Sequence, residues 1–206
     1  MRVKKFWKPA SVVTVAGLIL GVGLLHAQTA ATTATVAAGT KPFSVAVNPV
    51  TSKIYVTSLN NVKVIDGATN NTTTVKTGTT DTHVAVNPVT NKIYVANKFG
   101  NNVTVIDGAT NKTTTVAAGM EPFFVALNPV TNKIYVTNNA SNNVTVIDGA
   151  TNTTTTVAAG GDPEAVALNP VTNKIFVANA FNSTVTVIHG VTNKTTTLAA
   201  FFSRSR

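Results

Sequence analysis

Apolar and polar residues alternate in short runs through most of the chain. Runs such as 43–47, 53–57, 62–66 and 72–76 have about five residues each and are rich in valine, isoleucine, threonine and aromatic residues. Alternation with a period of two is typical of half-buried β-strands. The segments between residues 41 and 200 show no helical period. The pattern therefore predicts an all-β protein.

Turn-forming residues separate these runs. The segment Asn48-Pro49-Val50-Thr51-Ser52 cannot continue a central strand, because proline lacks the backbone donor and restricts the residue before it. The segment 66–70, Asp-Gly-Ala-Thr-Asn, supplies a glycine and side-chain acceptors for a tight hairpin. Each unit therefore contains four strands joined by short connections.

This unit occurs four times. Its Asn-Pro pairs begin at Asn48, Asn87, Asn128 and Asn169, so the spacings are 39, 41 and 41 residues. Four short strands in about 40 residues match one blade of a β-propeller. We predict four tandem four-stranded antiparallel blades at about 41–80, 81–121, 122–162 and 163–200, within a repeat domain spanning 28–200. An extra strand is expected at 33–37, and 201–206 is expected to be a tail.

The motifs Asn-Pro-x-Thr-Asn-Lys-Ile-Tyr-Val-x-Asn and Val-Ile-Asp-Gly-Ala-Thr-Asn resemble those of the YVTN-repeat β-propeller family, a group of surface-layer-like exported proteins. The resemblance covers residues 34–200. It implies a radial ring of antiparallel sheets and, for most members, a structural or binding role. Rings of this kind usually have about seven blades, so four blades depart from the pattern.

The blade count leaves several arrangements open. The strand at 33–37 and the last strand, at 195–198, compete for one place in a ring closed by its own ends. After Ala200 the repeat pattern is not continued. The expectations are a truncated array, a small four-bladed ring, or a homodimer in which two chains close a ring of eight blades.

The N-terminus has the order of a secretory signal. Four basic residues, Arg2, Lys4, Lys5 and Lys8, precede an uncharged apolar run at 11–25, and small residues follow. We expect a signal peptide at 1–27 with cleavage after Ala27, with a cut after Ala31 as the alternative. An uncleaved anchor, which would be the one contact with a membrane, is the other alternative. Each places the repeats outside the cytoplasm, in the periplasm, at the cell surface or in the medium.

Charge and composition narrow the function. The net charge is +9, but from residue 28 onward there are twelve basic and seven acidic residues, which is a balance of +5. Two of those basic residues are Arg204 and Arg206, so the balance of the repeats is +3. This weak field argues against nucleic-acid binding, which needs clustered Lys and Arg. The absence of cysteine excludes disulfides and a thiol nucleophile.

The two loop ends of a propeller differ in this sequence. At one end the repeated Lys53, Lys92, Lys133 and Lys174 lie on the same side as Asp66, Asp107 and Asp148, with His189 in the fourth blade. A Lys–Asp contact per blade is one interpretation, and the favoured one is solvated surface pairs that contribute little. At the other end the loops vary from blade to blade, and binding sites are usually built on such loops. The candidate binding residues there are Lys98, Phe99, Glu121, Phe123, Asp162, Glu164 and Phe181. The expected partner is a protein or a cell-envelope ligand.

Enzymatic chemistry has little support in the sequence. Asp162 and Glu164 resemble a carboxylate pair, but alternate strand residues are expected on opposite faces. His83 and His189 have no third ligand for a metal. We therefore predict a non-enzymatic binding or structural scaffold without catalytic residues, metal or cofactor. The alternatives are a propeller enzyme of lactonase-like type and a fragment without a function of its own.

Overall fold

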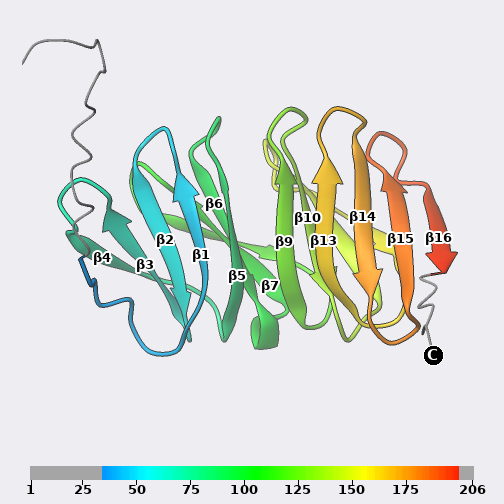
Figure 1. The fold of residues 1–206 in the computed structure, drawn as a ribbon, viewed down its shortest axis with the longest axis horizontal. Coiled ribbons are helices and arrows are strands. Elements are labelled where there is room, and N and C mark those ends of the chain that lie inside the picture. The colour runs from blue at the N-terminus through cyan, green and yellow to red at the C-terminus, as the bar shows by residue number, and fades with distance from the viewer. Residues whose placement is uncertain (1–33, 200–206) are drawn as a thin grey trace, which may run out of the picture. The chain divides into compact units, whose positions relative to one another are not determined.

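The computed structural model describes residues 34–199, which form four consecutive antiparallel sheets of four strands each (Figure 1). The first sheet contains β1 (Pro42–Asn48), β2 (Lys53–Ser58), β3 (Asn61–Asp66) and β4 (Thr72–Lys76). The second contains β5 (Asp81–Asn87), β6 (Lys92–Asn97), β7 (Asn102–Asp107) and β8 (Thr113–Ala117), with the 3-10 helix η1 (Lys98–Gly100) after β6. The third contains β9 (Pro122–Asn128), β10 (Lys133–Asn138), β11 (Asn143–Asp148) and β12 (Thr154–Ala158). The fourth contains β13 (Pro163–Asn169), β14 (Lys174–Asn179), β15 (Thr184–His189) and β16 (Thr195–Ala199).

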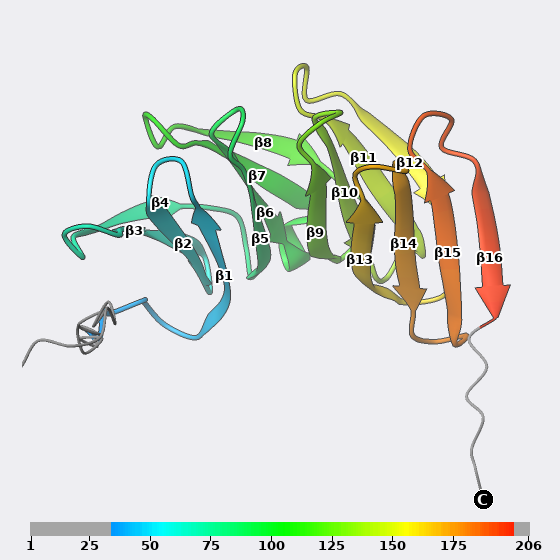
Figure 2. The ribbon, with the colours of Figure 1, turned by 45° about the horizontal axis from the view of Figure 1, so that its top comes forward.

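This arrangement confirms the predicted all-β fold of four tandem four-stranded repeats. Each strand pairs with the next one along the chain. The first strands of successive sheets pack on one another, β1 on β5, β5 on β9 and β9 on β13, as innermost strands of propeller blades do. Figure 2 shows the four sheets in succession from β1 to β16. The strand packing between sheets within residues 34–199 joins consecutive sheets, as in part of a propeller.

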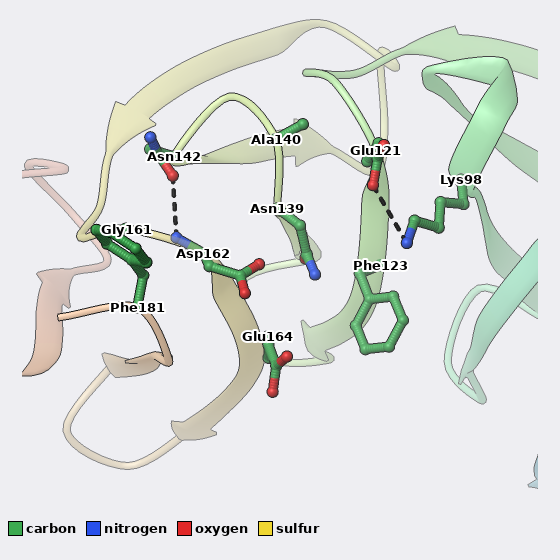
Figure 3. A pocket seen from close by; sticks show the side chains of 10 residues that line it. All are labelled: Lys98, Glu121, Phe123, Asn139, Ala140, Asn142, Gly161, Asp162, Glu164 and Phe181. Carbon is green, nitrogen blue, oxygen red and sulfur yellow. Dashed lines mark hydrogen bonds and ion pairs between the residues drawn. The ribbon is translucent and has the colours of Figure 1, made fainter. Parts of the chain in front are cut away.

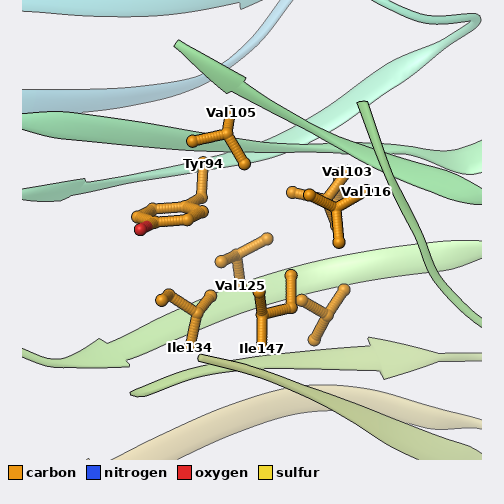
Figure 4. Packing of buried hydrophobic residues seen from close by; sticks show 9 residues of the cluster. Tyr94, Val103, Val105, Val116, Val125, Ile134 and Ile147 are labelled. Atoms are coloured by element: carbon orange, nitrogen blue, oxygen red, sulfur yellow. The ribbon is translucent and has the colours of Figure 1, made fainter. Parts of the chain in front are cut away.

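The hydrophobic core lies between the sheets. Three separate clusters fill the three spaces between consecutive sheets. Because side chains alternate along a strand, each sheet has two apolar faces: Tyr94 points toward the third sheet, whereas its neighbours Ile93 and Val95 point toward the first. We call these the forward face and the rear face. Figure 4 shows the cluster in which the forward face of the second sheet meets the rear face of the third.

The two faces repeat the same residues from sheet to sheet. The forward face of the first sheet consists of Tyr55, Val62, Val64 and Val75, and the rear face of the second consists of Val84, Ile93, Val95 and Ile106. The equivalent tyrosine and valines of the second and third sheets are also buried. Burial of such apolar area, worth about 25 cal/mol per Å², is the main force that joins the sheets.

Asparagine side chains fix the spacing of the sheets. In the Asn-Pro turn of the second sheet, Asn87 Oδ1 accepts a hydrogen bond from Val89 N at 3.0 Å, which holds the turn. Asn87 Nδ2 donates to Asn132 Oδ1 of the third sheet at 2.9 Å. The same bridge runs from Asn48 to the second sheet and from Asn128 to the fourth. One residue type thus closes the turn and joins consecutive sheets.

A Lys–Asp contact forms in one sheet rather than in each. Within residues 34–199 it is made by Lys133 Nζ and Asp148 Oδ2, at 2.8 Å. Lys53 Nζ instead donates to the carbonyl of Gly108 in the next sheet at 2.8 Å, and Lys92 makes the equivalent contact. The carboxylate of Asp66 is already engaged by its own turn, where the backbone N–H and hydroxyl of Thr69 donate to it and lower its pKa.

The extra strand predicted at 33–37 is not formed in the described part, where residues 34–39 have no regular secondary structure. A strand needs a partner edge, and the outer edge of β15 is already paired with β16. The predicted signal peptide at 1–27 and the tail at 201–206 lie outside the described residues. A search of residues 34–199 finds no helix with the length and apolar character needed to span a membrane.

The asparagine bridge can be tested by Asn87→Asp. Asp keeps the acceptor for the turn but loses the Nδ2 donor and places a carboxylate, fully buried, beside Asn132 Oδ1. We expect a loss of about 2 kcal/mol in the free energy of unfolding, measured by urea denaturation.

The control for this substitution is Asn169→Asp. Asn169 holds its own turn in the same way, through Val171 N at 2.9 Å, but it is exposed and bridges to no further sheet among residues 34–199. A change within about 0.5 kcal/mol is expected. Equal losses in the two variants would show that the bridge does not stabilise the fold.

Candidate binding site

Two kinds of loop meet at one end of the sheets. One connects the second and third strands of a sheet, and the other links one sheet to the next. Their backbones are joined by hydrogen bonds from Lys98 N to Thr80 O at 2.9 Å, from Asn139 N to Glu121 O at 3.0 Å and from Ala180 N to Asp162 O at 2.9 Å. The variable loops named from the sequence are therefore brought together, and we call this region the loop end.

Three residues at equivalent positions hold the sheet-to-sheet links in a left-handed backbone conformation. Thr80, Glu121 and Asp162 have φ values of 58°, 52° and 53°. The N–H of each donates to the side chain of an asparagine in the preceding sheet, as Asp162 N does to Asn142 Oδ1 at 2.9 Å. Non-glycine residues in this conformation carry a cost of about 1–2 kcal/mol. The fold therefore fixes this backbone while the side chain differs from one link to the next.

A hollow of about 640 Å³ lies at the loop end, between residues of the second, third and fourth sheets and their links (Figure 3). Six of the seven candidate binding residues line it: Lys98, Glu121, Phe123, Asp162, Glu164 and Phe181. The seventh, Phe99, lies outside the lining, with its ring centre 5.6 Å from Lys98 Nζ. Positions chosen from loop variation alone thus converge on one place.

Acidic groups outnumber basic groups in the hollow. Lys98 Nζ lies 3.2 Å from Glu121 Oε2, so one carboxylate is neutralised within the site (Figure 3). Asp162 and Glu164 have no cation within ion-pair distance among residues 34–199. Three carboxylates against one ammonium group give a formal charge of −2. The hollow therefore favours a cationic ligand.

The prediction that Asp162 and Glu164 lie on opposite faces is wrong, because both line the hollow (Figure 3). Strand alternation applies only within a strand, and β13 begins at Pro163. Asp162 belongs to the link and has the left-handed conformation, so its side chain is not set by the pleat.

Two aromatic rings, those of Phe123 and Phe181, also line the hollow. The Phe123 ring centre lies 5.7 Å from Lys98 Nζ and packs edge-on against Phe43 at 6.2 Å between centres. Phe181 is exposed and lies against Gly161, where a Cβ atom would come within 3.1 Å of its ring. Exposed rings beside carboxylates are suited to binding ammonium or guanidinium groups.

Four lining residues were not among the predicted ones: Asn139, Ala140, Asn142 and Gly161. Asn142 could have been found, because an asparagine pair recurs at this place in the first three repeats. Ala140 and Gly161 have no polar side chain, and Asn139 does not recur at the equivalent positions, which are Lys98 and Ala180. Only the fold shows that these three border the hollow.

Two titratable residues of the second sheet, the buried Asp81 and the half-buried His83, lie away from the hollow. Burial raises the pKa of Asp81 from 3.8 to about 6, although its carboxylate accepts hydrogen bonds from Thr77 Oγ1 and Asn97 Nδ2. Burial lowers the pKa of His83 from 6.5 to about 4, and its ring stacks on Phe124 with 3.7 Å between centres. Perturbed groups can mark active sites. Here both pack between sheets, and Asp81 stands where the other three sheets have proline.

A search of residues 34–199 for three or more His, Cys, Asp or Glu side chains placed to hold a metal ion finds none. His83 accepts a hydrogen bond from Val125 N at 3.4 Å through Nδ1. His189 ends β15, in a different sheet. The two histidines therefore do not share a site.

Comparison with known proteins supports the fold. No family model matches the sequence, and no curated protein matches it. Among solved structures, the chain is similar to Kuenenia stuttgartiensis hydrazine synthase, with a TM-score of 0.68 and 18% identity. The match covers 77% of this chain and 49% of the other, so this chain spans about half of that protein's length. At this identity the likeness supports a propeller-like repeat fold and nothing further.

The buried carboxyl group of Asp81 predicts a pH-dependent effect of Asp81→Asn. Between pH 4 and 6 the folded state holds a proton that the unfolded state, with an ordinary pKa of 3.8, has lost. The wild-type stability contributed by this group therefore falls as the pH rises through about 6. Asn cannot ionise and keeps one donor and one acceptor.

We expect the stability advantage of Asp81→Asn to grow from pH 4.5 to pH 7.5, measured from urea midpoints at both values. His83 also titrates differently in the two states, but it is present in both proteins and cancels in the difference. An advantage independent of pH would show that the carboxyl group does not titrate in this way.

Proposed function

We propose that this chain is an exported, non-enzymatic propeller-like scaffold that binds a basic segment of a partner protein in the hollow at the loop end. The observation that carries the proposal is the meeting of six residues from the variable loop end in one hollow on an otherwise repetitive scaffold. We also infer that the chain is a member of the YVTN-repeat family. The fourfold recurrence of its two motifs supports this inference.

The chemistry of the hollow suits lysine or arginine side chains. Asp162 and Glu164 offer two carboxylates without a cation, and Phe123 and Phe181 offer aromatic rings. A cation over an exposed ring gains about 0.5–1 kcal/mol. The volume, about 640 Å³, falls within the range of small-ligand sites and has room for a few side chains of a peptide.

A binding role is favoured over catalysis by the exposure of the charged groups. Glu164 is exposed and Asp162 is half-exposed, whereas catalytic acids and bases are usually tuned by burial. A lactonase-like activity would need charged residues on the innermost strands, where alanine and valine predominate. Hydrazine synthase is an enzyme by its name, but 18% identity carries no activity to this chain.

Export is proposed from the N-terminal sequence. The basic residues at 2–8, the apolar run at 11–25 and the small residues after it have the order that secretion requires. The periplasm, the cell surface and the medium are all consistent with this. A cysteine-free fold held by apolar burial does not depend on the redox state of any of these compartments.

Binding can be tested by NMR with tetralysine and tetraglutamate peptides as probes. We expect tetralysine, and not tetraglutamate, to shift the amide signals of Gly161, Asp162 and Phe181. The double variant Asp162→Asn/Glu164→Gln should bind tetralysine about tenfold more weakly. Phe181→Ala should weaken it about fivefold.

The control is Phe99→Ala, which removes another exposed loop phenylalanine, at the equivalent position of the second sheet, that does not line the hollow. Its affinity for tetralysine should equal that of the wild type. A preference for tetraglutamate, or an equal loss in Phe99→Ala and Phe181→Ala, would contradict the proposed site.

Export can be tested by expressing the full chain in a bacterial host, fractionating the cells and sequencing the N-terminus of the product. We expect a periplasmic or secreted product that begins at Gln28. Replacing Arg2, Lys4, Lys5 and Lys8 by alanine should lower the exported fraction, because the basic segment orients the apolar run. Replacing the three lysines by arginine keeps the charge and should leave export unchanged. Retention of the uncut wild-type chain in the cytosol would refute export.

A further inference from the structure

The forward face of the fourth sheet has no sheet packed on it among residues 34–199. Its residues, Phe176, Val185, Val187 and Leu198, occupy the positions of Tyr135, Val144, Val146 and Val157, which the fourth sheet buries. Leu198 is 51% exposed, whereas Val157 is 5% exposed. This face therefore has the composition of a buried interface but lies open.

The rear face of the first sheet is open in the same way. Val45 is 63% exposed, whereas Val84 and Val125, at the same position in the next two sheets, are 2% and 1% exposed. Ile54 and Val56 of this face are only partly buried. Lys63 of this face stands where the next two sheets have the buried Thr104 and Thr145. Apart from this lysine, the two open faces resemble the two halves of an interface that occurs three times within the chain.

A groove on the fourth sheet shows what its missing neighbour would insert. On the third sheet, Lys133, Val146 and Thr155 border a space of about 100 Å³ that is closed on its other side by Gly190 and Asn193 of the next sheet. On the fourth sheet the equivalent Lys174, Val187 and Thr196 border a hollow of about 430 Å³ without such a turn. The larger volume is the space that the turn of a following sheet would occupy.

We propose that a second copy of this chain docks the rear face of its first sheet on the forward face of the fourth sheet. The turn 66–70 of the second copy, Asp-Gly-Ala-Thr-Asn, would enter the groove as Gly190 and Asn193 enter the one before. Two such contacts, related by a two-fold axis, cover all four open faces in a ring of eight sheets.

Polar groups at this contact complement one another. Lys53 and Lys92 each donate to a glycine carbonyl of the following sheet, and Lys174 is placed to donate in the same way to Gly67 of the second copy. The groove carries Lys174 and Lys194, and the entering turn carries Asp66. Opposite charges therefore meet at the contact.

The substitutions that distinguish this fourth interface from the other three include Leu198 for valine, Lys63 for threonine and two further changes. Phe176 replaces the tyrosine whose hydroxyl group, at Tyr55, Tyr94 and Tyr135, is buried without a hydrogen-bond partner in residues 34–199. Loss of that hydroxyl removes an unsatisfied polar group. Ser52 replaces the asparagine that accepts the bridge elsewhere, and its hydroxyl is a shorter acceptor for Asn169.

The first measurement is the mass of the protein in solution, by light scattering after size-exclusion chromatography of the product of the full chain. We expect the mass of two chains. Val45→Glu and Phe176→Glu should each reduce it to one chain, because each places a charge in one half of the contact. Val89→Glu is the control, since Val89 is 76% exposed although its sheet is packed on both faces, and this variant should remain a pair.

The decisive experiment mixes the two disrupted variants. Val45→Glu keeps an intact forward face and Phe176→Glu keeps an intact rear face, so a 1:1 mixture should recover a mass of two chains. Circular dichroism should show the wild-type strand content in each variant, since both residues are exposed. A wild-type monomer, which would mean that other residues of the same chain cover the faces, would overturn the proposal. So would a mass above two chains, or a mixture that stays monomeric.

Discussion

Apolar contact between successive sheets is the interaction on which the rest of this structure depends. A single four-stranded sheet has two apolar faces and no interior of its own, so each face is exposed to water until another sheet covers it. Valine, isoleucine and tyrosine supply the contact area, and the Asn87-type bridges set the alignment at one end of each sheet. Stability is therefore a property of pairs of sheets, which is the behaviour of repeat proteins.

The same constraint separates the scaffold from the loop end. Side chains within the strands are held by their packing partners, whereas the links are held by backbone hydrogen bonds and by asparagine side chains such as Asn142. The side chains of Glu121 and Asp162 take no part in those bonds. The residue type can therefore change at these positions without disturbing the sheets. The acidic hollow is lined by side chains that the fold does not constrain.

The strands were largely predictable because their pattern is repeated. The run 72–76 coincides with β4, β2 and β3 differ from their predicted runs by one residue at one end, and β1 is one residue longer at each end. Contacts between sheets were not predictable in the same way. The sequence places Lys53 opposite Asp66, but whether the amine reaches that carboxylate or the carbonyl of Gly108 depends on how closely the sheets approach. Asp162 and Glu164 were misplaced because the conformation of Asp162 is set by its link.

The near-identity of the internal interfaces has a consequence for how such a chain changes in length. Removing one whole repeat exposes a face that is nearly the same as the one removed, with Phe176 and Tyr135 differing by one hydroxyl. Gaining or losing a unit of 41 residues would therefore leave the surface at each end almost unaltered. A chain of this architecture can therefore gain or lose whole repeats, and the apolar faces exposed at its two ends stay similar.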